Sequence, residues 1–338
     1  TQSSDIKKRN QVGLEPIKPL LTLIDKIQTR EDLWKSVAQL HKNGTGPFFM
    51  IDAESDYKNP NINIAHFDQG GLGLPNRDYY LDKDKEKIRK KYLIFLENIF
   101  EYSKDLFPEN NSKIQAKEVL KFETRLAKNH LNKELRQEPE RVYNPIIAKK
   151  LTNWKTYFEG IKLDTNKKIN IEHPPYFSFL EKIKVNSEVI SYLRLHTILS
   201  FTGCSSQKIY DITFDFYAKE LSGAKKQKSL EERNITLTSG YLGELLGKEY
   251  VSKHFSHENK KEVEKLVGEL KKSLHKILTE LEWMSAETKK EALKKLKGMG
   301  VKIGYTDKWK NYSKLELEDD NLINNAIRIN KFEWNRMV

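Results

Sequence analysis

Two histidines form the nearest approach to a metal site in this sequence. His254 and His257 are separated by Phe255 and Ser256, and Glu258 follows them. A spacing of three can place two imidazoles on one face of a helix, an arrangement that suits zinc. These residues, however, are expected in the loop ahead of a long helix, and the glutamate follows the second histidine. We therefore expect no metal ion here.

The motif of a helical zinc site, His-Glu-x-x-His, occurs nowhere in the chain. The remaining histidines are scattered, and we interpret them as surface residues or hydrogen-bonded core residues: His41, His66, His130, His173, His196 and His275. The sequence accordingly gives no metal-binding, cofactor-binding or catalytic residue in this chain.

Nucleophilic and acid–base chemistry also lack a motif. Cys204 is the only cysteine, which excludes an internal disulfide framework, and no base is positioned near it in the sequence. Gly-x-Ser-x-Gly is absent. The chain has 48 Asp and Glu residues, so the presence of a carboxylate pair would decide nothing. Glu123 and Arg125 lie on a predicted helix, where we expect structural contacts.

Residues 69–81 contain a glycine-rich turn around which the chain is organised. Three of four consecutive positions, 70–73, are glycine, Pro75 fixes a turn, and Asn76 and Asp78 favour a turn and a helix start. A dinucleotide-binding Gly-x-Gly-x-x-Gly would require glycine where Asn76 stands, so no nucleotide cradle is predicted. Arg77 could bind an anion, but a structural anchor tied to carbonyls or a carboxylate is the favoured interpretation.

The composition indicates a charge-rich, mostly helical protein. Hydrophobic residues make up 38% of the 338, charged residues 32%, and the mean hydropathy is −0.71. No apolar run approaches the roughly 20 residues of a membrane span. The formal charge of +12 would suit a nucleic-acid binder, but lysines alternate with Glu and Asp over 83–91 and 260–272, as on solvated helix faces. We expect no nucleic-acid partner.

The hydrophobic pattern predicts a mainly α fold: one large multi-helical body with a small β-hairpin near the N-terminus. The hairpin is predicted from strands at 48–51 and 62–67, broken at 58–61. Helices are predicted at 18–27, 30–41, around 88–102, 114–131, from 176, over 263–281, after Ser285 up to Gly298, and at 321–338. The apolar stripe of the 263–281 helix is interpreted as a core face, with a partner-binding face as the alternative.

Six ordered phrases carry a resemblance to a known family. They are Gly71–Leu81 (Gly-Leu-Gly-Leu-Pro-Asn-Arg-Asp-Tyr-Tyr-Leu), Glu138–Pro145 followed by Trp154 and Tyr157, Ser191–His196, Asp215–Tyr217 with Leu221–Gly223, Gly243–Val251, and Ile303–Trp309. Together they resemble the neprilysin-like zinc metallopeptidases over residues 10–338. Departures from the family pattern are Leu195 in place of tryptophan, Leu230-Glu231 in place of an Arg-Trp pair, and Thr306 in place of proline. The first should reduce a core contact and the last should leave a less rigid loop.

The resemblance implies a two-lobed peptidase in which one lobe carries zinc and the other caps a closed cavity. Residues 1–338 would form the helical capping-lobe region with its inter-lobe connections, and the zinc-bearing lobe is not in this chain. Zinc is therefore expected for the full-length parent and not for this chain. The implied partners are the catalytic lobe of the same parent and a peptide substrate. The compartment is unassigned, although the resemblance suggests an extracytoplasmic one.

Three hypotheses of function follow. The favoured one is the capping portion of a zinc metalloendopeptidase that hydrolyses small peptides, inactive by itself. The second is a free-standing helical binding or regulatory module derived from that lobe, which relaxed constraint at Leu195, Leu230, Glu231 and Thr306 would permit. The third is a basic nucleic-acid binder, which the interleaved charge disfavours and strong, salt-sensitive DNA binding would revive.

Overall fold

The computed structural model describes residues 4–107 and 111–337, and it divides into two compact units. Unit 1 comprises the chain through Glu231 together with the segment from Leu315 onward, and unit 2 comprises Glu232–Lys314. The fold is mainly helical with a small sheet, which confirms the predicted class. The assignment of all of 1–338 to one capping lobe stays a prediction, and residues 1–3, 108–110 and 338 lie outside the described part.

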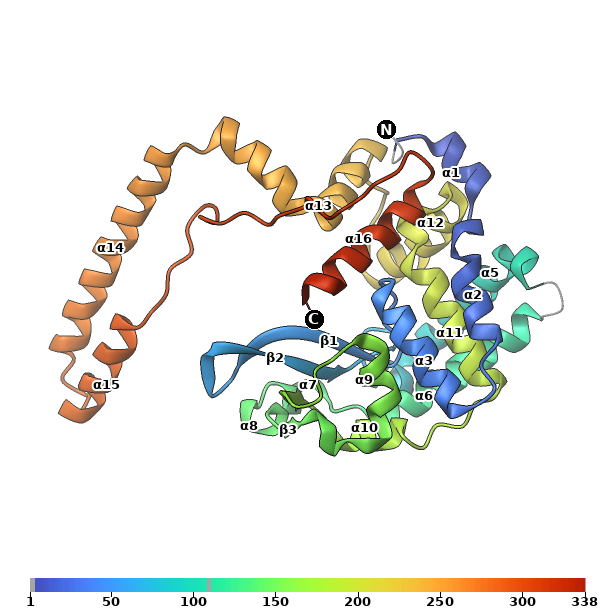
Figure 1. Ribbon diagram of the computed structural model, residues 1–338, viewed down its shortest axis with the longest axis horizontal. Helices are drawn as coiled ribbons and strands as arrows, with labels where there is room; N and C mark the ends of the chain where they lie inside the picture. Colours follow the sequence, from blue (N-terminus) through green and yellow to red (C-terminus); the bar gives the residue numbers. More distant parts are fainter. Residues whose placement is uncertain (1–3, 108–110, 338) are drawn as a thin grey trace. The chain divides into compact units, whose positions relative to one another are not determined.

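Unit 1 holds the sheet and most of the helices (Figure 1). Its α-helices are α1 Ile6–Val12, α2 Lys18–Asp25, α3 Arg30–Lys42, α4 Asp78–Leu81, α5 Glu86–Tyr102, α6 Ser112–Lys128, α7 Lys133–Arg136, α8 Pro139–Val142, α9 Lys155–Ile161, α10 Pro174–Leu180, α11 Ser187–Ser200, α12 Gln207–Thr213 and α16 Leu322–Met337. Its strands are β1 Phe49–Asp56, β2 Asn59–Gln69, β3 Pro145–Ile147 and β4 Lys168–Ile171. A π-helix, Phe214–Leu221, follows α12 directly.

Local sequence signals account for where several of these helices begin. Thr29 caps α3 with a complete capping box, in which the Thr29 hydroxyl accepts from the Asp32 amide and the Asp32 carboxylate accepts from the Thr29 amide. Asn111 caps α6 through the amides of Lys113 and Ile114. The predicted helices at 18–27, 30–41, 88–102 and 114–131 are confirmed within a few residues. The final helix ends at Met337, and the predicted last residue, Val338, is outside the described part.

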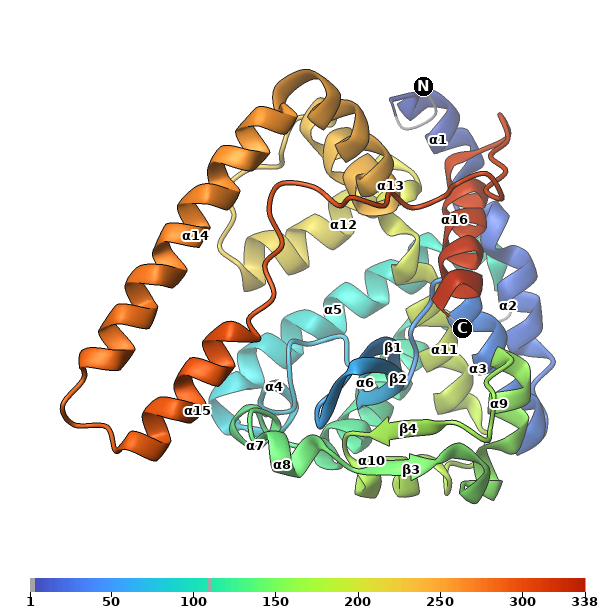
Figure 2. The ribbon, with the colours of Figure 1, turned by 60° about the vertical axis from the view of Figure 1, so that its left-hand side comes forward.

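The sheet contains the predicted hairpin and two strands that the sequence did not reveal. β1 and β2 pair antiparallel from Phe49 with Gln69 to Asp56 with Asn59, so both strands run longer than predicted. β2 pairs in parallel with β4, and β4 pairs antiparallel with β3, which gives the order β1-β2-β4-β3 seen in Figure 2. With three and four residues, β3 and β4 are too short to show an alternating pattern.

An aromatic cluster forms the core where the hairpin meets the helices. The Trp34 ring of α3 lies 4.6 Å from Trp154 and 5.6 Å from Phe48, centroid to centroid. Phe49 of β1 packs 5.1 Å from Tyr157 of α9 and 5.3 Å from Phe177 of α10. Large rings that bury together in offset and edge-on geometries supply much of the apolar burial that stabilises such a core.

Unit 2 consists of α13 Leu230–His254, which begins two residues before the unit boundary, α14 His257–Glu280 and α15 Ala286–Lys297. α13 is broken at Leu242, whose φ of −130° is not helical. The predicted long helix and the helix capped by Ser285 and closed at Gly298 are confirmed. The prediction that the apolar face of α14 is a core face is wrong for this chain, because five of its apolar side chains are exposed: Val263, Leu266, Leu270, Leu274 and Ile277.

Candidate functional site

Glu123 of α6 is a titratable group of unit 1 that has no exposed surface. Its Oε2 accepts hydrogen bonds from the hydroxyls of Tyr80 and Tyr92, both 2.8 Å long. Its Oε1 lies 3.0 Å from Nε2 of His196 on α11. Three side chains, from α4, α5 and α11, therefore converge on this one carboxylate of α6.

This carboxylate holds the glycine-rich turn in place. The Tyr80 hydroxyl, which donates to Glu123, also accepts a 2.8 Å hydrogen bond from the amide of Leu74. Burial, followed by the charge of Glu123, raises the pKa of Tyr80 and of Tyr92 well above its usual range. Both hydroxyls thus remain protonated donors. The predicted structural role of Glu123 is confirmed, and so is that of Arg125, whose Nη2 lies 2.6 Å from Oε2 of Glu188.

Glycine is required in this turn because other elements approach its backbone. Gly71 has a φ of +75°, and a Cβ there would lie 2.5 Å from the backbone nitrogen of Phe48. The hydroxyl of Tyr192 donates to the Gly71 carbonyl at 2.9 Å and accepts from the Phe48 amide at 2.8 Å. The positive charge of Arg77 contributes to lowering the pKa of His130 and of His173, after burial. The structure gives Arg77 no carbonyl or carboxylate partner among the described residues, so its predicted anchoring stays a prediction.

A second group of titratable side chains lies on one face of the sheet, near its end. Nδ1 of His66 is 3.3 Å from Oε1 of Glu172, and Arg136 forms an ion pair with Asp68. Burial raises the pKa of Asp68, and burial together with the charge of Asp68 raises that of Glu172. Two carboxylates with raised pKa values can share a proton. The His66 side chain is only 4% exposed, which limits any contact with a substrate.

The residues present do not fit a zinc ion. His254 is the last residue of α13 and His257 is the first of α14, so the two lie on different helices and not together in a loop as predicted. Ser256 between them caps α14 through the amide of Asn259. Within residues 4–107 and 111–337, no group of three or more His, Cys, Asp or Glu side chains could hold a metal ion. The described residues therefore offer no ligand set for zinc.

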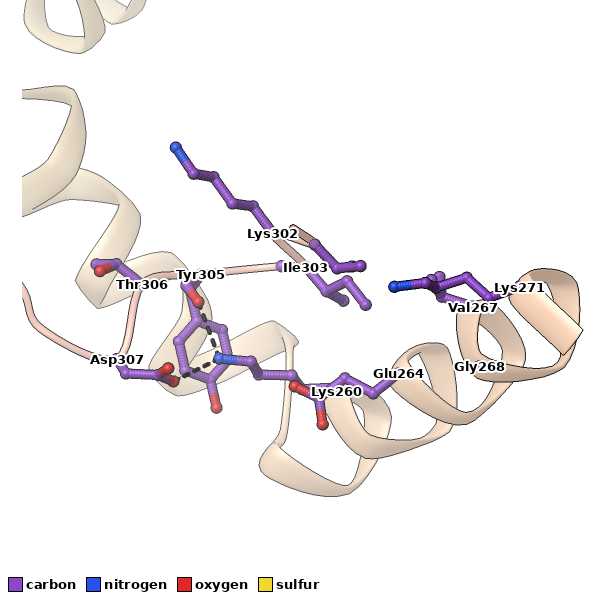
Figure 3. Close-up of a pocket in the computed structure, with 12 residues that line it drawn as sticks. Lys260, Glu264, Val267, Gly268, Lys271, Lys302, Ile303, Tyr305, Thr306 and Asp307 are labelled. Atoms are coloured by element: carbon purple, nitrogen blue, oxygen red, sulfur yellow. Dashed lines mark hydrogen bonds and ion pairs between the residues drawn. The ribbon is translucent and has the colours of Figure 1, made fainter. Parts of the chain in front are cut away.

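Unit 2 contains a cavity of about 710 Å³ between α14 and the segment 301–307. Figure 3 shows Lys260, Glu264, Val267 and Lys271 of α14 across from Ile303 and Tyr305 of that segment, while the Lys302 side chain extends away from the helix. The lining thus mixes apolar side chains with three lysines and two acidic groups, Glu264 and Asp307. Such a lining matches a bound group that is apolar and is flanked by polar atoms.

Lys260 of α14 binds the segment 301–307 through hydrogen bonds. Its Nζ donates to the Tyr305 carbonyl at 3.0 Å and to Oδ1 of Asp307 at 2.7 Å, and it lies 4.5 Å from the centroid of the Tyr305 ring (Figure 3). The hydrogen bond to Asp307 raises the pKa of Lys260. A protonated ammonium cannot act as a nucleophile. This contact was not predicted, because 47 residues separate the two side chains and no motif links them.

The positions that depart from the resemblance are accommodated in the structure. Leu195 is fully buried in α11. The Thr306 hydroxyl accepts from the Lys308 amide at 3.2 Å and donates to the Lys308 carbonyl at 3.0 Å, so a local turn forms without proline. Leu230 and Glu231 begin α13.

Comparison with known proteins places most of the chain in one family. The family model described as Peptidase family M13 matches residues 2–306.

No helix in the described part of the chain has both the length and the apolar character that crossing a membrane requires.

Curated relatives match over nearly the whole chain but only over about half of their own length. Endothelin-converting enzyme 1 of Cavia porcellus is 26% identical over 96% of this chain and 47% of that protein. Neprilysin of Mus musculus is 27% identical over 90% of this chain and 45% of that protein.

Solved structures share the fold. The zinc metalloprotease Zmp1 of Mycobacterium tuberculosis, solved in complex with an inhibitor, superposes with a TM-score of 0.91 at 24% identity, over 99% of this chain and 52% of that one. PepO of Lactobacillus rhamnosis gives a TM-score of 0.86 at 19% identity, over 99% and 56%.

Proposed function

Because the chain belongs to peptidase family M13, we propose that it is the capping portion of a zinc-dependent metalloendopeptidase that hydrolyses small peptides. The observation that carries the proposal is the family match over residues 2–306, combined with coverage of about half the length of the relatives. The zinc-bearing catalytic lobe would be the missing partner, and this chain by itself would be inactive.

In this proposal the chain encloses the peptide substrate and contributes no catalytic residue. Its aromatic core and the anchored turn around Glu123 give a rigid lobe that could close over a peptide and exclude folded proteins by size. When bound in the other lobe, zinc would supply the activated water and polarise the scissile carbonyl. No residue of this chain is assigned a part in that step.

The experiment that tests the proposal is the intact mass, with metal analysis, of the protein isolated from its source. A mass well above 39.7 kDa with zinc bound supports a capping lobe of a longer peptidase. A mass near 39.7 kDa without metal contradicts it. As a second measurement, the pure 338-residue chain should not cleave a model peptide in the presence of zinc, and zinc-dependent cleavage by it would overturn the claim of inactivity.

The second candidate function is a free-standing helical binding or regulatory module. The observation that favours it is the exposed apolar face of α14, which a module could present to a partner. The same mass measurement separates the two, since only the module is complete at 39.7 kDa. For the peptidase, an extracytoplasmic location is part of the proposal, and cell fractionation would test it.

A further inference from the structure

Three nitrogen-bearing side chains of unit 1, Arg77, His130 and His173, lie close together and are here called the Arg77 cluster. Arg77 directly precedes α4, His130 follows the end of α6 by two residues, and His173 directly precedes α10. Nε2 of His173 lies 3.1 Å from the carbonyl oxygen of Asn129, the neighbour of His130. The positive charge of Arg77 acts on both imidazoles. Residues far apart in the sequence thus form one group beside the glycine-rich turn.

The guanidinium of Arg77 has no partner in the part of the chain that the structure describes, residues 4–107 and 111–337. The nearby Arg89 differs, because its Nη1 donates to the carbonyls of Tyr79 and Asp82 at 2.9 and 2.7 Å. A guanidinium presents its N–H groups as a planar fork that matches the oxygens of an anion. Since Arg77 is only half-buried, a ligand can reach this fork.

His130 contributes a second unpaired nitrogen. The residue is 7% exposed, and its Nε2 has no hydrogen-bond partner among the described residues. Its ring packs edge-on against that of Tyr176, with 4.6 Å between the centroids, so the imidazole is held in place. A buried polar atom without a partner costs free energy, and a bound ligand can supply the missing hydrogen bond.

The electrostatics of the Arg77 cluster favour an anion. Burial, and after it the charges of Arg136 and His173, lower the pKa of His130 to about 3. Burial and the charge of Arg77 likewise lower the pKa of His173. Arg136 is already neutralised by its ion pair with Asp68, whereas Arg77 is not. A nearby negative charge would favour the protonated imidazoles and would turn both histidines into additional cationic donors.

The backbone of the adjoining turn adds further donors. The amides of Gly71 and Leu72 have no acceptor among the described residues. The φ of +75° at Gly71 is the left-handed conformation that occurs in backbone concavities that bind anions. The negative charge of Glu123, which anchors this turn, is offset by its own two hydroxyl donors. The turn therefore does not oppose an anion beside Arg77.

We propose that the Arg77 cluster binds a phosphate group, held by the guanidinium of Arg77 and the imidazoles of His130 and His173. A tetrahedral dianion can offer two oxygens to the planar fork and others to the imidazoles, whereas a carboxylate has only two oxygens and one charge. The ligand is inorganic phosphate or a phosphate monoester. This inference goes beyond the proposed function and does not depend on it, since neither zinc nor a peptide enters the argument.

The test is a calorimetric titration of the 338-residue chain at pH 7 with inorganic phosphate, phosphoserine and acetate. Phosphate should bind at one site, and acetate should bind at least about tenfold more weakly. Binding of phosphoserine as tight as that of phosphate identifies a monoester as the ligand, and its rejection identifies the free ion. Acetate binding as tight as that of phosphate, or no saturable binding of phosphate at millimolar concentrations, overturns the proposal.

The variant Arg77→Gln should weaken phosphate binding by at least about tenfold, because charge-assisted hydrogen bonds are lost. The matched control is Arg89→Gln, which removes the same charge from a guanidinium that carbonyls already hold. Its affinity for phosphate should stay within about twofold of that of the natural chain. Equal losses in the two variants would reveal a general effect of surface charge and would overturn the site.

The imidazole signals in NMR spectra of the unaltered chain locate the ion, even if a variant fails to fold. Phosphate should shift the ring signals of His130 and His173, because the anion favours their protonated forms. The variants His130→Gln and His173→Gln assign these signals, and the exposed His275 serves as the internal control. A shift at His275 as large as that at His130, or no shift at either histidine of the cluster, overturns the proposal.

Discussion

Unit 1 and unit 2 are both helical and both rich in lysine, yet they bury their apolar residues very differently. In unit 1 the rings of Trp34, Tyr92, Tyr157 and Phe122 are almost fully inaccessible, and even a carboxylate, Glu123, is enclosed with its donors. In unit 2 a helix with an equally regular apolar pattern keeps that pattern at the surface. The apolar periodicity of a helix therefore predicts that one of its faces will be buried, but it does not predict whether the same chain buries that face.

The first and largest expected difference between the units concerns Glu123. Changing Glu123 to Ala leaves the hydroxyls of Tyr80 and Tyr92 and a ring nitrogen of His196 without their acceptor, so unit 1 should lose about 3–5 kcal/mol of unfolding free energy. Urea unfolding followed by hydrogen exchange checks this, with slow-exchanging amides of α5 and α6 as the probes of unit 1.

The exposed Glu134, changed to Ala, is the matched control and should shift stability by less than about 0.5 kcal/mol. Exchange in unit 2 should not respond to Glu123→Ala. A loss of protection in α14 as large as that in α6 would mean that the two units do not unfold separately.

A second difference is in the response to acid. Burial lowers the pKa of His41 to about 4, and its neutral ring is satisfied by the Tyr157 hydroxyl at 2.6 Å and the Pro47 carbonyl at 2.9 Å. Because the unfolded chain binds a proton near pH 6.5 and the folded chain does not, unit 1 should lose stability as the pH falls from 6.5 toward 4. The shift corresponds to on the order of 3 kcal/mol.

The contribution of His41 is isolated by comparing the pH dependence of the natural chain with that of His41→Gln. This comparison is needed because the raised pKa values of Asp68 and Glu172 act in the opposite direction. The slope between pH 6.5 and 4 should be smaller in the variant, and the exposed His275→Gln should retain the natural slope. Equal slopes in His41→Gln and the natural chain would contradict the prediction.

The smallest changes in stability are expected from two glycine-to-alanine substitutions, one of which destabilises and one of which stabilises. Gly71→Ala places a Cβ against the backbone of Phe48 at a positive φ, so unit 1 should lose at least about 2 kcal/mol. Gly247→Ala lies in α13, where a Cβ meets nothing within 4 Å, and should stabilise that helix by about 0.5–1 kcal/mol. Local exchange rates measure both, and destabilisation by Gly247→Ala would mean that α13 is packed more tightly than the structure shows.

Local sequence signals predicted much of the fold. The capping box at Thr29, the apolar spacing of Tyr92, Phe95 and Ile99, and the alternation in the hairpin specify their elements through interactions between near neighbours. The six family-like phrases predicted the family that the comparison then showed. The glycines of residues 70–73 also indicated a special turn, although not which side chains surround it.

Tertiary structure alone decided the contacts between residues far apart in the chain. Glu123 lies 43 residues from Tyr80 and 73 from His196, and Lys260 lies 47 from Asp307, so no local pattern could link them. The strand β4 forms against the edge of β2, and β3 forms against the edge of β4, which their own three or four residues do not reveal. The same reason explains the error on α14: its sequence determines an amphipathic helix, whereas burial of the stripe depends on which surface packs against it.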